Sequence, residues 1–120
     1  MSETRFVLND VVAEVYTGNL EMDWCYIKIT FIGLGMYINS FKVTASTEYE
    51  GYAVYPPRHI QKGRGLVKSV EFEGKQNFGK VIEQLALRAA EIWREDDGDT
   101  KNAIVKMSDF NGLFNPVSII

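Results

Sequence analysis

Aromatic and cationic side chains alternate along neighbouring segments of this 120-residue chain. Trp24, Tyr26 and Lys28 occupy every second position of one segment, and Lys42 lies in the next. In an extended strand, every second side chain points to the same face. Aromatic rings on such a face can stack on the bases of single-stranded nucleic acid, while ammonium groups neutralise its phosphates. These four residues are therefore candidates for nucleic-acid contact.

A second cationic segment follows in the middle of the chain. Residues 51–70 contain basic side chains and no aspartate or glutamate, and residues 24–47 also lack acids, although the net charge is −3. Cations that are segregated within an acidic chain predict a basic surface on the folded protein. Such a surface attracts phosphates because binding releases their counterions. The candidate phosphate contacts in the second segment are Arg58, Lys62, Arg64 and Lys68.

Enzymatic chemistry has less support in the sequence. The chain has one cysteine, Cys25, and one histidine, His59, which excludes an internal disulfide and a two-histidine metal site. Cys25 alternates with isoleucines, which favours a core position over a reactive thiol. The glycines at 63 and 65 do not have the spacing of a phosphate-binding loop. We therefore predict a protein that is not an enzyme and that binds no cofactor or metal.

The elements that would position these side chains are mainly strands. Runs rich in β-branched and aromatic residues predict strands at 5–16, 22–32, 36–45, 49–55 and 66–73, with a short one possible at 103–107. Residues 56–66 are predicted to form a long connection with a basic tip. In the 36–45 strand we expect Tyr37, Phe41, Val43 and Ala45 on one side, and Ser40, Lys42 and Thr44 on the other.

One amphipathic helix follows the strands. Apolar residues recur at helical spacing from 78 to 93, which predicts a helix with one buried stripe. Asn77 is the expected N-cap and Gly98 marks the expected end. The acids at 95–97 oppose the helix dipole, so we expect the last turn to fray.

These elements predict an α+β fold, with an antiparallel β-sheet of about five strands and one long amphipathic α-helix packed on it. Residues 1–98 form the expected domain, and 99–120 form a C-terminal tail that packs on the domain or on a partner. No apolar run approaches the roughly 20 residues that a membrane span needs. The N-terminal segment also lacks the apolar core of a signal peptide. The expected location is the cytoplasm.

The order of features in the middle of the chain matches a known pattern. A strand with the sequence MYINSFKV at 36–43 precedes GYAVYPPR at 51–58, then a glycine-bearing polar loop, the strand at 70–72 and the helix. This order resembles the SpoVG family of bacterial septation and sporulation regulators. In that family, a strand that ends in Met-Pro-Ser and a basic residue leads to a polar loop, a further strand and a single helix. The resemblance spans about 6–93, and Tyr55-Pro56-Pro57 departs from the family's Met-Pro-Ser.

The resemblance implies a nucleic-acid-binding regulator of a bacterium or its phage, which binds DNA or RNA and forms a homodimer joined through strands. One alternative is a single-stranded DNA-binding domain of the transcriptional-coactivator type, which also has a curved antiparallel sheet followed by a helix. Another is a protein-interaction module encoded by a phage or mobile element. In that module the apolar tail would dock on itself or on a protein partner; its apolar residues are Leu113, Phe114, Val117, Ile119 and Ile120.

Overall fold

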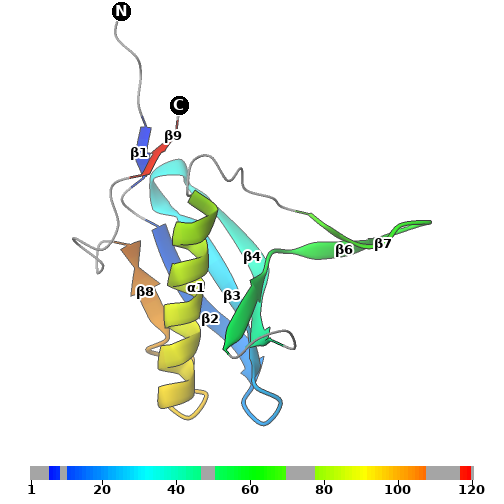
Figure 1. Ribbon diagram of the computed structural model, residues 1–120. Coiled ribbons are helices and arrows are strands. Elements are labelled where there is room, and N and C mark those ends of the chain that lie inside the picture. The colour runs from blue at the N-terminus through cyan, green and yellow to red at the C-terminus, as the bar shows by residue number, and fades with distance from the viewer. Residues whose placement is uncertain (1–5, 9–10, 47–50, 70–77, 108–116, 120) are drawn as a thin grey trace, which may run out of the picture.

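A computed structural model describes residues 6–8, 11–46, 51–69, 78–107 and 117–119 of the chain (Figure 1). The strands are β1 (Phe6–Leu8), β2 (Val11–Asn19), β3 (Trp24–Phe31), β4 (Met36–Ala45), β5 (Tyr52–Tyr55), β6 (Arg58–Gln61), β7 (Gly65–Lys68), β8 (Ile104–Lys106) and β9 (Val117–Ile119). The helices of these ranges are the 3-10 helix η1 (Ile32–Leu34) and the α-helix α1 (Phe78–Glu95). Five strands form an antiparallel sheet in the order β5-β4-β3-β2-β8, and α1 packs on one face. The predicted α+β class is confirmed.

The core lies between α1 and one face of this sheet. Along β3, buried and half-buried side chains alternate, so that Cys25, Ile27 and Ile29 are fully buried against the helix. The predicted apolar stripe of α1 faces these residues, and Leu85 and Trp93 of this stripe are fully buried. Burial of each large apolar side chain contributes roughly 1.5–3 kcal/mol relative to exposure. The described part of the chain therefore has one buried sheet face. Its single α-helix leaves the opposite face uncovered, and we call this the open face.

An irregular register divides β4 into two halves. Ile27 pairs with Phe41 while Ile29 pairs with Ile38, so β4 carries one extra residue between these pairs. Ser40 lies in this bulge and has a φ of 67°, in the left-handed region. The bulge reverses the alternation, because Tyr37 pairs with Thr30 of the open face and is 61% exposed. The prediction that Tyr37 shares a face with Phe41 is therefore wrong.

The predicted connection at 56–66 is mostly a hairpin. β6 pairs with β7 in antiparallel register, from Arg58 opposite Lys68 to Gln61 opposite Gly65. Gly63 and Gly65 have φ values of 83° and 76°, which glycine adopts without a Cβ penalty. The β6–β7 hairpin extends away from the sheet as an arm (Figure 1). The second strand of the hairpin, β7, was predicted to continue to residue 73, and residues 70–73 lie outside the described residues.

The end of α1 is closed by backbone hydrogen bonds. The Gly98 N–H donates to the Trp93 carbonyl at 2.8 Å and the Asp97 N–H donates to the Arg94 carbonyl at 3.2 Å. This is the Schellman arrangement, with Asp97 in the left-handed conformation at a φ of 52°. The predicted end at Gly98 is confirmed, and these bonds satisfy the carbonyl groups of Trp93 and Arg94. The fraying expected from the acids at 95–97 stays a prediction. The expected N-cap Asn77 lies outside the described residues.

A polar cluster joins the end of α1 to the sheet. The Tyr52 hydroxyl donates to Asp23 Oδ2 at 2.6 Å, and the Arg94 guanidinium lies 3.7 Å from the centre of the Tyr52 ring. Arg94 Nη1 also lies 4.0 Å from Asp23 Oδ1. The hydrogen bond to the Asp23 carboxylate is the main cause that raises the pKa of Tyr52. The cluster ties together β5, the turn before β3 and the last turn of α1.

Two short strands come from the segment that was predicted to be a tail. β8 pairs with β2 at one edge of the main sheet, and β9 pairs with β1, which brings residues 6–8 and 117–119 side by side (Figure 1). Most of the apolar segment after residue 107 lies outside the described residues. Among the helices that the structure describes, none has the length and apolar character required to cross a bilayer.

Gly18 of β2 lies against the buried ring of Trp93 in α1. A Cβ at this position would lie 2.6 Å from Cζ2 of Trp93 and 2.9 Å from Cβ of Cys25. Gly18→Ala is expected to lower the free energy of unfolding by about 1–3 kcal/mol, because the buried indole must shift. Gly33→Ala is the matched control, since a Cβ there meets no atom within 4 Å. Urea denaturation of both variants measures the difference, and equal stabilities would contradict this account of Gly18.

Candidate nucleic-acid interface

The open face of the sheet carries the aromatic and cationic residues that the sequence alternation predicted. Trp24, Tyr26 and Lys28 of β3 are half-buried and point away from the core, since the residues between them are buried against α1. Lys42 of β4 pairs with Tyr26 across the two strands. Because cross-strand partners share a face, these four predicted site residues lie together on the open face.

Cations on this face lie over aromatic rings. The ammonium nitrogen of Lys42 lies 5.5 Å from the centre of the Trp24 ring, and that of Lys28 lies 5.1 Å from the centre of the Tyr37 ring. The Arg58 guanidinium lies 4.6 Å from the Tyr55 ring. Each distance is within the range of about 6 Å for cation–π attraction. These contacts hold the cations on the face and leave their charge accessible to solvent.

The aromatic residues form a row across β2 and β3. The Tyr16 and Tyr26 rings are stacked, with centres 6.3 Å apart and planes inclined by 24°. Trp24 meets Tyr26 edge to face, with ring centres 5.3 Å apart. Tyr16 is the extra residue that β2 carries between Val15 and Thr17, relative to β3. Because Val15 is buried, alternation along β2 also places Tyr16 on the open face.

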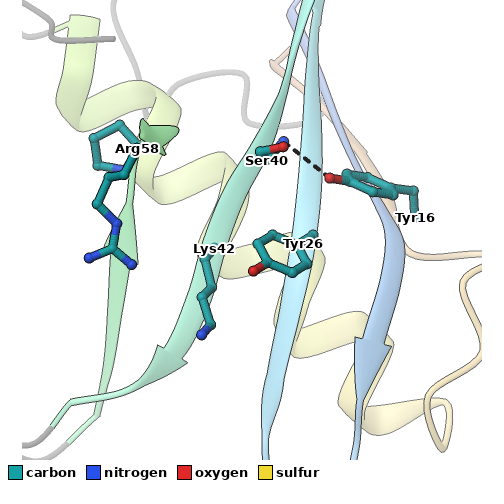
Figure 2. Close-up of a pocket in the computed structure, with 6 residues that line it drawn as sticks. Tyr16, Tyr26, Ser40, Lys42 and Arg58 are labelled. Atoms are coloured by element: carbon teal, nitrogen blue, oxygen red, sulfur yellow. Dashed lines mark hydrogen bonds between the residues drawn. The ribbon is translucent and has the colours of Figure 1, made fainter. Parts of the chain in front are cut away.

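A pocket of about 320 Å³ opens beside the tyrosine pair. It is lined by Tyr16, Tyr26, Ser40, Lys42, Pro56 and Arg58, from β2, β3, β4 and the β5–β6 region. Figure 2 shows Lys42 and Arg58 extending in the same direction on neighbouring segments, with the Tyr26 ring beside Lys42. The Ser40 backbone N–H donates to the Tyr16 hydroxyl at 3.2 Å, which fixes the ring at one end of the pocket.

The remaining predicted phosphate contacts lie on the β6–β7 arm. Lys62 and Arg64 are exposed in the turn at its tip, and Lys68 is exposed at its base, opposite Arg58. The structure thus brings Arg58 together with Lys42 and Tyr26, and it places Lys62 and Arg64 on the projecting arm instead. The eight predicted residues form a sheet face and an arm, which meet at Arg58.

Residues that the sequence reasoning missed complete the face. They are Tyr16, Tyr37, Tyr55 and Pro56. Tyr37 was hidden by the bulge in β4, because simple alternation gives the wrong face after an inserted residue. Tyr16 could have been found, because alternation from the buried Val15 places it on the open face. Tyr55 pairs with Lys42 across β4 and β5, a register that requires knowledge of which strands are neighbours. The acid-free composition of 51–70 was a usable signal for this region.

The cations of the open face differ in their charge partners. Lys28 forms an ion pair with Glu14 at 3.1 Å. Among the described residues, no carboxylate pairs with Lys42 or Arg58. Within the described ranges, their positive charges face aromatic rings and solvent. The pocket between them is therefore suited to an anionic group.

The predicted core position of Cys25 is confirmed, since the side chain is fully buried. Burial raises the pKa of the Cys25 thiol to about 12, so the reactive thiolate is scarce at neutral pH. His59 is exposed on the arm, where its ring Nδ1 lies 2.7 Å from the Ser69 hydroxyl. Within the described residues, no group of three or more His, Cys, Asp or Glu side chains is arranged to hold a metal ion.

Comparison with protein-family models matched no family, and searches of curated proteins and of solved structures found no match.

The raised pKa of Cys25 predicts a pH-dependent contribution to stability. The unfolded thiol ionises near pH 9 and the folded thiol near pH 12, so the contribution is fully present below about pH 9 and is lost as the pH rises towards 12. The stability advantage of the wild type over Cys25→Ala should fall by about 1.4 kcal/mol per pH unit above this point. Urea denaturation of both proteins at pH 7 and pH 10.5 measures it. A constant advantage would contradict the burial argument.

Proposed function

We propose that this chain is a non-enzymatic nucleic-acid-binding regulatory protein of the kind that the SpoVG-like pattern implies. The observation that carries the proposal is the composition of the uncovered sheet face. There Trp24, Tyr26 and Lys42 lie in mutual contact, and Arg58 and Lys42 line one pocket. Stacking surfaces next to cations are the combination that single-stranded nucleic acids need.

Local charge supports the proposal more than total charge does. The chain as a whole carries −3, which repels polyanions at long range. At physiological salt, charges beyond roughly 8 Å are screened, so the cations near a bound phosphate dominate. The pocket and the arm present Lys42, Arg58, Lys62 and Arg64 without a carboxylate partner among the described residues. An acidic protein can therefore bind a polyanion on this side.

The β6–β7 arm supplies a second contact in this proposal. Lys62 and Arg64 at its tip would contact backbone phosphates, which orient a nucleic acid without reading its sequence. The sheet face would contact the bases. The proposal extends to a cytoplasmic homodimer joined through strands. In support, the edge strand β5 pairs only with β4 among the described residues, and an unpaired strand edge is a template for a second copy.

A protein-interaction module is the second candidate. Large apolar side chains are exposed around η1, at the end of the sheet between β3 and β4. Ile32, Leu34 and Met36 are 56%, 54% and 46% exposed. Clustered apolar residues on a surface indicate contact with a protein. A purified chain that binds no nucleic acid at low salt would favour this candidate.

Charge reversal on the arm tests the proposed function. Fluorescence anisotropy with labelled DNA and RNA, each single-stranded and duplex, should show affinity that falls steeply as salt rises. The Lys62→Glu/Arg64→Glu variant should bind at least tenfold more weakly, which corresponds to about 1.4 kcal/mol. The control is Lys80→Glu/Lys101→Glu, which makes the same change in net charge at exposed positions on α1 and the turn after it. Equal losses in both variants would mean that net charge, and not the arm, controls binding.

A further inference from the structure

The pocket beside the tyrosine pair is a built site that the proposed function does not yet use in detail. We propose that it holds one nucleotide of a single-stranded nucleic acid, with the base stacked on Tyr26 and the phosphate between Lys42 and Arg58. This inference rests on the proposed function and names the form of nucleic acid that the open face recognises. The charge, size and surroundings of the pocket support this assignment.

The charges of the pocket favour an anion. Some cations of the described chain lie near carboxylates: Lys28 near Glu14 at 3.1 Å and Arg88 near Glu91 at 2.7 Å. Lys42 and Arg58 have no such partner among the described residues, although both line one pocket. A guanidinium can donate two parallel hydrogen bonds to phosphate oxygens, and a nearby ammonium adds a point charge. A phosphate would therefore find two uncompensated cations on one side of the pocket.

The aromatic wall of the pocket is fixed before any ligand binds. The Tyr26 ring contacts the Tyr16 ring in a stacked arrangement and the Trp24 ring in a T-shaped one. Tyr16 is fixed in turn by the hydrogen bond that it accepts from the Ser40 N–H at 3.2 Å. Side chains that are already ordered lose little conformational entropy on binding. A base that stacks beside this pair would extend an existing aromatic row.

The size of the pocket favours one unpaired nucleotide. Its volume of about 320 Å³ lies at the lower end of the roughly 300–1,000 Å³ that small-ligand sites occupy. In a duplex, the faces of the bases are covered by stacking within the helix, so they cannot reach a tyrosine ring unless the base is extruded. A single strand exposes these faces without that cost.

The surroundings of the pocket favour a polymer over a free nucleotide. The aromatic and cationic row continues from Trp24 at one end of β3 to Tyr37, opposite Thr30, near the other end. Eight residues of β3 span roughly 26 Å. The face therefore extends well beyond a pocket for one nucleotide, as expected for successive bases of one strand.

Ring removal tests the base contact. Tyr26→Leu should weaken binding of a single-stranded 12-mer by at least fivefold, because stacking contributes about 1–3 kcal/mol per base. Tyr26→Phe keeps the ring and should bind as the wild type does. Duplex affinity should change less than twofold in either variant. Thermal melting of each variant confirms that the fold is retained, and equal binding by the folded Tyr26→Leu variant would overturn the proposal.

Two further measurements locate the nucleotide. Lys42→Gln should reduce the slope of the logarithm of the binding constant against the logarithm of the salt concentration by about 0.7. This is the contribution of one phosphate contact on a single strand. The matched control Lys80→Gln removes an exposed lysine of α1, which packs on the other face of the sheet, and should leave the slope nearly unchanged. Photocrosslinking of a 5-iodouracil 12-mer should modify Tyr16 or Tyr26. Crosslinks found only on the arm at 58–68 would overturn the proposal.

The outcomes separate this inference from the proposed function. If the wild type binds none of the four nucleic acids at low salt, the proposed function itself fails. If the wild type binds with strong salt dependence but Tyr26→Leu binds equally well, only the nucleotide site fails. Competition by uridine monophosphate as effective as that by the unlabelled 12-mer would overturn the assignment to a polymer, because one nucleotide would then supply all of the affinity.

Discussion

A five-stranded sheet has two faces, and in the described part of this chain one α-helix covers only one of them. The covered face is apolar, with residues such as Ile27 and Phe41 packed against the helix. The other face must be compatible with water, yet it carries tyrosines and a tryptophan. Lysines and an arginine over the ring faces resolve this conflict, because they attract the rings and keep the surface hydrated. In the proposed function, the same pairing supplies rings on which bases stack and charges that contact phosphates.

The open face depends on the core beneath it, because both are made from the same strand. Trp24 and Tyr26 flank Cys25, whose side chain packs near the point where Gly18 admits the Trp93 ring. A shift of the helix would therefore displace the backbone that carries the aromatic row. The polar cluster of Asp23, Tyr52 and Arg94 holds the same end of the helix, so that core packing and surface geometry are fixed together.

Local patterns were sufficient to predict much of this arrangement. Strict alternation in β3 predicted both its buried side and the shared face of Trp24, Tyr26 and Lys28, and helical spacing predicted α1. The same alternation along β2 places Tyr16 on the open face. The position of Tyr37 could not be read in this way, because it depends on a bulge that is defined only by the neighbouring strand. The sequence predicted a connection with a basic tip at 56–66, which matches Lys62 and Arg64 at the end of the arm. It did not show that Arg58 lies beside Lys42, since strand pairing between distant segments decides this.

The bulge at Ser40 determines which changes of length β4 can accept during evolution. Even-numbered residues of β4 face the core up to Ile38, and odd-numbered residues face it from Phe41 onwards. Loss of a single codon between these positions would restore uniform pleating and would leave Ile38 and Phe41 on the same buried face, because the extra residue is what separates the two alternations. The cost of such a deletion would fall on the open face, since it removes the bulge from which the Ser40 N–H donates to the Tyr16 hydroxyl. A one-residue deletion within either half would instead turn part of the strand over, so the bulge is the one place where β4 can be shortened without exchanging its surfaces.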